Sequence, residues 1–385
     1  MFCSIVNNIF NKKSDSEIVS KTNMCDYDLK TYIDFSKLDE DGYLEEKNLK
    51  VVNYKDYKIL KYKKENLNEE NIDSYGLFRS VVLKNDKLIG FAPPKSGLVE
   101  KLEDKDGLQY QEYIEGTMIN LIHDGEEWIV TTRSNIGGNN NFYKGSKSFR
   151  YMFLEATNSY DDFSFDKLNK EHTYSFVLHH PENSMVLQVS KPTLYLTNVY
   201  KCNDDYTVNV VELNDEEISD IVDKPEVYKY ITSIQNAKDI YASESSIHFI
   251  QGVVIMDGTT RYKIRNPNYE EVRKLRGNQP KIQYQYYILR KMKKINLFLK
   301  HYPNYSKQFF EFRNDIYDFT TTLHNKYMEC FVFKKKTLKE SDGKYKIHMY
   351  NLHKKYIEEL YSKGEKVTKK VVVDYVNNLE PASLM

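Results

Sequence analysis

The sequence contains no apolar run long enough to cross a membrane as a helix. None of its hydrophobic stretches approaches the roughly 20 residues that a bilayer requires. The first apolar run, residues 1–6, is followed by Lys12 and Lys13 rather than preceded by them, which is the reverse of a secretory signal. We therefore expect a cytoplasmic protein from a reducing compartment, with no membrane partner.

Cysteine is also scarce, and metal-binding spacings are missing. The cysteines are Cys3, Cys25, Cys202 and Cys330. No two of them have C-x-x-C spacing, so neither a zinc site nor a disulfide framework is expected. His179 and His180 are adjacent, and neighbouring strand residues face opposite sides, which argues against a metal site there. The polar loop 137–147 contains no phosphate-binding G-x-x-x-x-G-K-[ST] motif.

Net charge is absent as well, because 56 Lys and Arg balance 56 Asp and Glu. The distribution is uneven: residues 271–385 hold about 24 basic against about 12 acidic residues, and residues 1–270 hold about 32 against about 44. The C-terminal third is thus a basic segment attached to an acidic body. RNA is a partner that such a segment suits, although a lysine-rich helical surface in solvent has the same composition.

The remaining composition favours a folded protein, with 40% hydrophobic and 14% aromatic residues. Residues 43–262 consist of short alternating runs rich in β-branched and aromatic residues, separated by turns at 123–125 and 256–258. Helices are expected at 147–157 and around 216–236, and then at 270–300, 305–330 and 347–378, with an exposed loop at 333–346.

These patterns predict an α+β fold of three segments. We expect an N-terminal extension over residues 1–42, an antiparallel-sheet domain over 43–268, and a basic, all-helical C-terminal domain over 269–385. The richness in Lys, Asn, Ile and Tyr is typical of AT-rich genomes, including those of large DNA viruses and some protists.

Six segments in order resemble the T4 RNA ligase 1-like family of covalent nucleotidyltransferases. They are Phe78-Arg79-Ser80-Val81-Val82-Leu83, Phe91-Ala92-Pro93-Pro94-Lys95, Gln111-Glu112-Tyr113-Ile114-Glu115-Gly116-Thr117-Met118, the hairpin from His123 to Ser134, the run from Tyr174 to Val186, and Ile250-Gln251-Gly252-Val253-Val254 with Tyr262-Lys263-Ile264-Arg265. Any one motif is weak evidence, but their order and spacing over residues 78–265 are specific. The resemblance implies a ligase-like nucleotidyltransferase domain.

The resemblance also implies that catalytic groups have been lost. The family's lysine, which attacks the α-phosphate of ATP, corresponds to Tyr113 in K-x-D-G. A phenol is a poor substitute, because it titrates near pH 10 and sits on a larger ring. Two family glutamates correspond to Val177 and Gln251, so Mg²⁺ would lack the carboxylate oxygens it prefers, and no metal site is predicted.

The family's phosphate-binding residues are largely kept. The resemblance assigns a nucleotide- or phosphate-binding role to Arg79, Lys95, Glu115, Gly116, Arg133, Lys263 and Arg265. At Arg133 and Arg265 the positive charge is kept, but the basic residue differs from the one that the family has there. Cations that converge on one cleft are costly unless an anion is bound there.

The leading hypothesis is therefore a catalytically inactive, RNA-ligase-like protein that binds RNA, or a nucleotide such as ATP or GTP, in a cationic cleft. A second hypothesis is an active ATP-dependent RNA ligase or capping-type enzyme in which Lys95, Lys144 or Lys147 replaces the lost nucleophile. A third is a structural or assembly protein that reuses the fold, with the cleft closed by aromatic side chains such as Tyr113.

Overall fold

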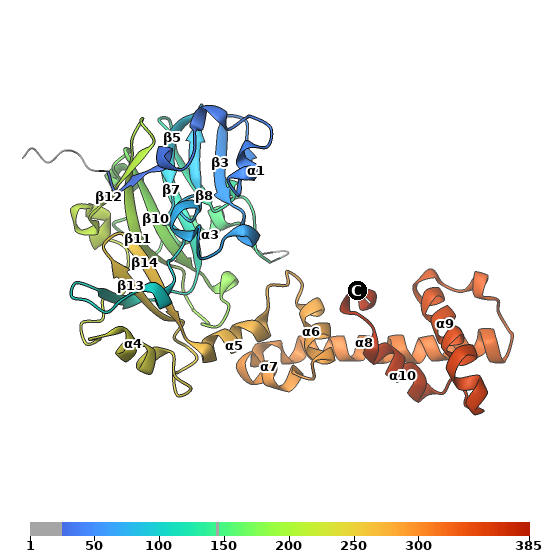
Figure 1. Cartoon of the computed structure of the whole chain (residues 1–385). Helices are drawn as coiled ribbons and strands as arrows, with labels where there is room; N and C mark the ends of the chain where they lie inside the picture. Colours follow the sequence, from blue (N-terminus) through green and yellow to red (C-terminus); the bar gives the residue numbers. More distant parts are fainter. Residues whose placement is uncertain (1–24, 144–145) are drawn as a thin grey trace, which may run out of the picture.

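The computed structural model describes residues 25–143 and 146–385. A strand-rich part comes first, and the helices α5 to α10 extend from one side of it (Figure 1). The predicted α+β class, with antiparallel sheets followed by an all-helical C-terminal part, is confirmed. Residues 1–24 of the predicted N-terminal extension, with Cys3, lie outside the described residues. No helix in the described ranges is long and apolar enough to span a membrane.

The strands form three antiparallel sheets. They are β1 (Tyr27–Asp28), β2 (Leu49–Asn53), β3 (Tyr57–Tyr62), β4 (Val81–Lys84), β5 (Lys87–Phe91), β6 (Gln109–Glu112), β7 (Thr117–His123), β8 (Trp128–Thr132), β9 (Asn135–Ile136), β10 (His172–His179), β11 (Thr193–Cys202), β12 (Thr207–Val211), β13 (Gly252–Asp257) and β14 (Thr260–Arg265). The largest has the order β1-β12-β11-β10-β7-β8-β9, and the others are β2-β3-β4-β5 and β14-β13-β6. The two predicted hairpin turns, β7 to β8 and β13 to β14, are confirmed.

The helices are distributed unevenly along the chain. They are α1 (Tyr43–Glu46), α2 (Ile72–Tyr75), α3 (Phe149–Thr157), α4 (Ile234–Tyr241), α5 (Pro267–Arg276), α6 (Ile282–Lys291), α7 (Ile295–His301), α8 (Ser306–Tyr327), α9 (Gly343–Lys355) and α10 (Lys369–Asn378). The predicted helix at 147–157 is confirmed as α3, which starts at an N-cap where the Ser148 side chain accepts a hydrogen bond from the Tyr151 amide.

The expectation of a helix around residues 216–236 is wrong for most of its length. The structure has only a 3₁₀ turn at Glu217–Asp220, and α4 begins at Ile234. Pro225 lies between them and has no amide hydrogen to continue a helix. The Ser233 side chain then caps α4 by accepting a hydrogen bond from the Asn236 amide.

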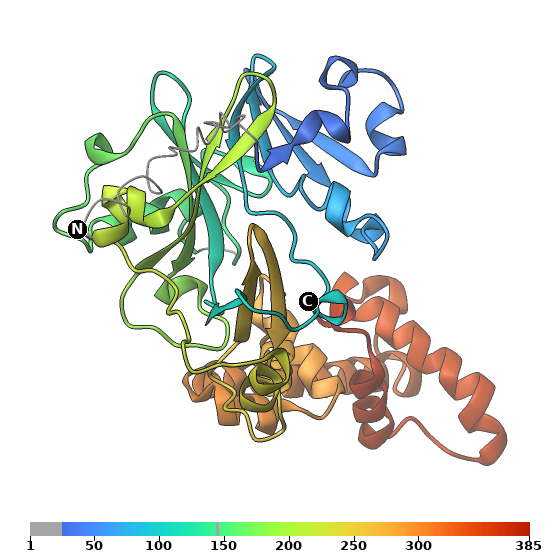
Figure 2. The same cartoon turned by 60° about the vertical axis from the view of Figure 1, so that its left-hand side comes forward.

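The core of the large sheet lies between its strands and α3. Phe153 of α3 and Phe176 of β10 are fully buried, and their ring centroids are 5.7 Å apart. The small sheet is covered by α4, from which Ala237 packs into one cluster with Val253 and Ile255 of β13. Two views of the chain show the small sheet between the large sheet and the first C-terminal helices (Figures 1 and 2).

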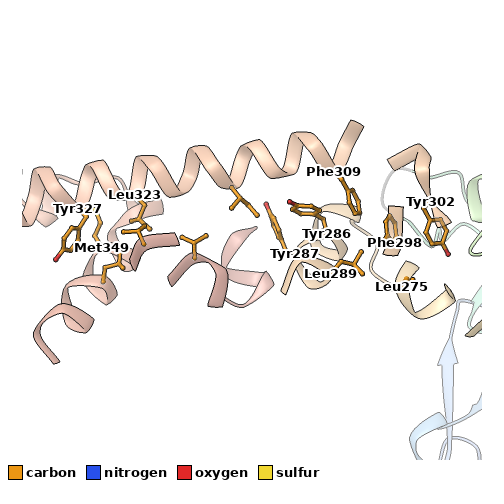
Figure 3. Packing of buried hydrophobic residues seen from close by; sticks show 14 of the residues in the cluster. Leu275, Tyr286, Tyr287, Leu289, Phe298, Tyr302, Phe309, Leu323, Tyr327 and Met349 are labelled. Carbon is orange, nitrogen blue, oxygen red and sulfur yellow. The ribbon is translucent and has the colours of Figure 1, made fainter. Parts of the chain in front are cut away.

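The C-terminal helices share a separate aromatic core (Figure 3). Its residues include Leu275, Tyr286, Tyr287, Leu289, Phe298, Tyr302, Phe309, Leu323, Tyr327 and Met349. The predicted loop at 333–346 is present, although α9 already starts at Gly343. The predicted helix at 347–378 is interrupted, because Gly364 takes a left-handed conformation with φ of +68° before α10 begins.

The two parts are joined by more than the chain connection between β14 and α5. Val186 follows β10 in the strand-rich part but is buried in the helical core cluster. The hydroxyl of Tyr302 on the loop after α7 donates a hydrogen bond to the carbonyl of Met185 at 2.9 Å. The segment 185–187 therefore belongs to the strand-rich part by sequence and packs against the helical part.

Candidate functional site

A cavity of about 350 Å³ lies against β14, β10 and the end of β6, and we call it the cationic cavity. Six basic side chains line it: Arg79, Lys95, Arg261, Lys263, Arg265 and Arg273. Glu112 is the one acidic side chain among its described lining residues. The cavity therefore carries a strong local positive charge although the whole chain is neutral.

Three of the cations belong to strand β14, in which every second side chain points to the same face. Arg261, Lys263 and Arg265 are two residues apart, and side chains at that spacing point to the same face of a strand. Arg79 comes from the chain immediately before β4, and Lys95 from the chain after β5. Segments distant in sequence thus contribute to one positively charged wall.

Tyr113 lies in the middle of this wall, just beyond the end of β6. The Nζ atom of Lys263 is 4.1 Å from the centroid of the Tyr113 ring, and the guanidinium carbon of Arg265 is 5.8 Å from it. Cations are attracted to the face of an aromatic ring at such distances. The Tyr113 ring, at the position where the family resemblance predicts a lost lysine, therefore contacts two cations of the cavity.

Four of the cations have no acidic partner in the part of the chain that the structure describes. Glu270 pairs with both Arg265, at 2.9 Å, and Arg273, at 3.3 Å. Within residues 25–143 and 146–385, no carboxylate forms an ion pair with the four others, Arg79, Lys95, Arg261 and Lys263.

The surroundings disfavour the charged forms of these groups. Burial and the neighbouring cations hold the pKa of Lys263 well below its ordinary value, and the same causes lower the pKa of Arg79 and of Lys95. The guanidinium of Arg79 donates only one long hydrogen bond, to the Pro93 carbonyl at 3.5 Å. The neighbouring positive charges of the cavity therefore repel one another unless an anion is bound.

Val177 and Gln251, where the family resemblance predicts that glutamates are replaced, also line the cationic cavity. Val177 projects from β10, and Gln251 precedes β13. The Oε1 atom of Gln251 is buried and receives no hydrogen bond from the described residues. No group of three or more His, Cys, Asp or Glu side chains that could hold a metal ion occurs in the described parts of the chain.

Gly116 lines the cavity and could not be replaced by a larger residue. Its φ is +151°, and a Cβ atom would lie 2.4 Å from the carbonyl oxygen of Leu178 and 2.7 Å from the Cγ1 atom of Val177. The glycine lets the chain pass close to β10 after the turn. This close approach sets the position of the preceding Tyr113.

Glu115 points away from the cavity, although the family resemblance assigns it to the nucleotide site. Its buried carboxylate accepts hydrogen bonds from the amides of Met185, Val186 and Leu187, at 2.7 to 3.2 Å. It also accepts one from the hydroxyl of Tyr269 on α5, at 2.7 Å. The structure thus places Glu115 in the contact between the two parts of the chain.

Arg133 likewise does not line the cavity. Its guanidinium lies 4.3 Å from the centroid of the Tyr62 ring and donates a hydrogen bond to the Tyr62 carbonyl at 3.1 Å. Tyr62 does line the cavity. Arg133 therefore acts on the cavity through the position of this tyrosine.

The lysines considered as replacement nucleophiles are in different places. Lys95 lines the cationic cavity, whereas Lys147 pairs with Glu155 at 2.7 Å and with Glu182 at 3.2 Å, outside it. Lys144 lies outside the described residues. His180 contacts the same Glu155 at 3.2 Å, and its neighbour His179 is buried, so the histidine pair is part of the interior.

Two lining cations, Arg261 and Arg273, were not predicted. Arg261 could have been found, because it precedes Lys263 by two residues on a strand of alternating pattern. Arg273 belongs to α5, which follows β14 in the chain, and it shares Glu270 with Arg265 of that strand. No local sequence signal indicates this.

No protein-family model matches the chain. Over 296 residues, the chain is 25% identical to a protein of Invertebrate iridescent virus 6 described as an immediate-early protein ICP-46 homolog. The match covers 70% of this chain and 64% of that relative, which is less than two thirds of its length. The chain thus has a viral relative. Membership of the T4 RNA ligase 1-like family stays a prediction from the motifs.

Among solved structures, the chain is similar to one described as "Putative ATP-dependent DNA ligase from Aquifex aeolicus". The TM-score is 0.38 at 14% sequence identity, and the alignment covers 84% of this chain and 80% of that one.

Proposed function

We propose that this protein binds the phosphates of a nucleotide or of RNA in the cationic cavity and does not ligate. The observation that carries the proposal is the convergence of four cations, Arg79, Lys95, Arg261 and Lys263, that have no acidic partner among the described residues. A cluster of like charges in a partly buried wall is unfavourable by itself. A polyphosphate or a phosphodiester strand supplies the missing negative charge.

Space for the rest of a nucleotide adjoins the phosphate-binding wall. A second cavity of about 490 Å³, the adjoining cavity, shares Lys95, Asn198 and Arg261 with the cationic cavity. Its lining includes the partly exposed tyrosines Tyr32 and Tyr262, whereas Tyr200 in the same lining is buried in the core. Aromatic rings bind bases of any sequence by stacking. The two cavities together fit a ligand with a charged and a planar end.

The polar groups of the cavity suit such a ligand as well. The buried Oε1 atom of Gln251 has no donor among the described residues. A ribose hydroxyl or a base amino group would donate to it. Tyr113, in turn, provides no amine at the position where the family resemblance requires one, and its ring lies beneath Lys263.

The proposal is tested by fluorescence anisotropy with labelled RNA and by titration calorimetry with ATP and GTP, at two salt concentrations. Arg79→Gln and Lys263→Gln are each expected to weaken binding about tenfold or more, because charge-assisted hydrogen bonds contribute about 1.5–3 kcal/mol. Lys87→Gln is the matched control, because Lys87 is exposed on β5 and does not line the cavity. Absence of binding to RNA, ATP and GTP would refute the proposal.

One observation favours a second candidate, covalent nucleotidyl transfer by Lys263. This amine lies over the ring of Tyr113, and its pKa is held well below the ordinary value by burial and by four nearby cations. A neutral lysine amine is nucleophilic. In this reaction Nζ attacks the α-phosphorus of ATP, the bond to the bridging oxygen breaks, pyrophosphate leaves, and the amine proton passes to solvent.

Incubation with α-labelled ATP or GTP and Mg²⁺ or Mn²⁺ separates the two candidates. A labelled band on a denaturing gel that disappears in Lys263→Arg and is labile to acid, as an N–P bond is, would establish the transferase. A band that persists in that variant would assign the reaction to another residue. No band, together with binding in the first experiment, is the result expected from the non-ligating protein.

A further inference from the structure

A third cavity lies where the strand-rich part meets the helices, and we call it the junction cavity. Its volume is about 610 Å³, and it shares no lining residue with the cationic cavity. Tyr143 and Glu182 line it from the strand-rich part, and Arg276, Lys281 and Tyr305 from the helical part. It is therefore built by both parts of the chain.

Arg276 is a buried cation in this cavity without an ionic partner. It is the last residue of α5, and only 5% of its surface is exposed. Its Nη1 atom donates no hydrogen bond to any residue in the ranges 25–143 and 146–385, and no carboxylate in these ranges forms an ion pair with it. A buried guanidinium without an acceptor is costly, so an acceptor is expected from elsewhere.

Two aromatic rings hold the guanidinium of Arg276. Its central carbon is 4.5 Å from the centroid of the Tyr143 ring and 5.5 Å from that of Tyr305. Rings that contact the face of a guanidinium leave the donors at its edge free. These donors form a rigid fork that matches two oxygens of a phosphate.

A second polar atom of the junction cavity is also unsatisfied. The hydroxyl of Tyr143 is buried and has no hydrogen-bond partner among the described residues. Glu182, the one acidic side chain among the described lining residues, is already paired. The Nζ atom of Lys147 lies 3.2 Å from its Oε1 atom, and the backbone amide of Lys147 donates a hydrogen bond to its Oε2 atom at 3.1 Å. Lys281 adds a second cation to the wall. The free groups are thus hydrogen-bond donors and positive charges.

We propose that the junction cavity binds a phosphate group, with Arg276 as a bidentate donor and the hydroxyl of Tyr143 as a further donor. This site stands independently of the cationic cavity. The helix α5 nevertheless connects the two, because Arg273 lines the cationic cavity and Arg276, three residues later, lines the junction cavity. Two sources share the required chemistry, free inorganic phosphate and a phosphate of a polynucleotide strand.

Binding is measured on the full chain with three probes. Inorganic phosphate is titrated and followed by ³¹P line broadening, and short oligouridylates with a 5′-phosphate or a 5′-hydroxyl are followed by anisotropy. Arg276→Gln is expected to lose about 10- to 100-fold in affinity for the phosphate-bearing probe that binds. Arg276→Lys keeps the charge but not the fork, and is expected to bind with intermediate affinity.

Arg313→Gln is the matched control, because Arg313 is exposed on α8 and lines neither cavity. Urea unfolding and circular dichroism of each variant separate lost binding from lost folding, and Arg276→Lys serves if Arg276→Gln does not fold. If the binding of inorganic phosphate is weakened in the Arg276 variants, the ligand of the site is the free ion. The same dependence seen only with the oligomers assigns it to a strand phosphate.

The proposal is overturned if the wild-type chain binds none of these probes, or if folded Arg276 variants bind as the wild type does. The test is distinct from that of the cationic cavity. Lys263→Gln is expected to weaken ATP binding about tenfold or more but to leave the Arg276-dependent binding of inorganic phosphate within about twofold. Either site can therefore fail while the other is supported.

Discussion

The carboxylate of Glu115 offers the sharpest test of how the structure differs from the family resemblance. The resemblance assigns Glu115 to nucleotide binding, whereas the structure places it in the contact between the strand-rich part and α5. We predict that Glu115→Gln destabilises the fold strongly but leaves ligand affinity of the folded protein nearly unchanged.

The expected magnitude follows from four donors that meet at this carboxylate. Three are the amides of Met185, Val186 and Leu187, and the fourth is the hydroxyl of Tyr269. A glutamine offers one acceptor oxygen, and its NH₂ group faces the donors that remain. At least two buried donors then lose their acceptor, at about 1–3 kcal/mol each. Together with the lost charge, we expect a destabilisation of about 3–5 kcal/mol.

Urea unfolding followed by circular dichroism measures this loss. With a slope of about 3 kcal/mol per molar urea, the midpoint should fall by about 1–1.7 M. Glu112→Gln is the matched control, because Glu112 lines the cationic cavity and accepts only one long hydrogen bond, from the Glu226 amide at 3.5 Å. Its stability should change by less than about 1 kcal/mol, and the removal of an acid from the cavity should strengthen anion binding.

The opposite pattern would refute the reasoning. If Glu115→Gln unfolded at the wild-type urea concentration but bound ATP or RNA at least tenfold more weakly, the carboxylate would belong to the ligand site. The structural assignment of the segment 185–187 would then be wrong.

Three further outcomes are expected. The affinity for RNA should fall steeply with salt concentration in the wild type and less steeply in Arg79→Gln or Lys263→Gln. A variant that neutralises one phosphate fewer displaces fewer counterions from the RNA when it binds, and equal salt slopes would contradict a phosphate contact. Gly116→Ala should destabilise the chain by several kcal/mol in urea unfolding, because its φ is +151° and a Cβ atom would clash with the Leu178 carbonyl, and a wild-type midpoint would exclude this strain. Burial raises the pKa of Asp124, but hydrogen bonds from two amides, a lysine and a tyrosine outweigh it and hold that pKa well below its ordinary value. Its stabilisation is therefore fully present above about pH 5 and is lost progressively as the pH falls below about 4 toward the lowered pKa; Asp124→Asn should remove this part of the acid dependence in unfolding experiments run from about pH 6 to about pH 2.

Period-two patterns were the most reliable signal in the sequence. They located the hairpins β7 to β8 and β13 to β14. The helical interpretation failed around residues 216–236, where Pro225 interrupts the chain. The segment boundaries at 42 and 268 stay predictions, although β1 at Tyr27–Asp28 already pairs with β12 of the large sheet.

The amino-acid sequence by itself determined that Tyr113, Val177 and Gln251 carry no amine or carboxylate, because the identity of a side chain fixes its chemistry wherever it lies. It also determined that basic residues recur in the same segments as in the resembled family. Only the tertiary structure decided which of them share a cavity. Arg273 of α5 lines the cavity together with residues of β14 and β10. Glu115 points away from the cavity, because the amides of segment 185–187 are donors that need a buried acceptor. Burial and through-space charge depend on chain segments far apart in sequence, and local patterns contain no information about them.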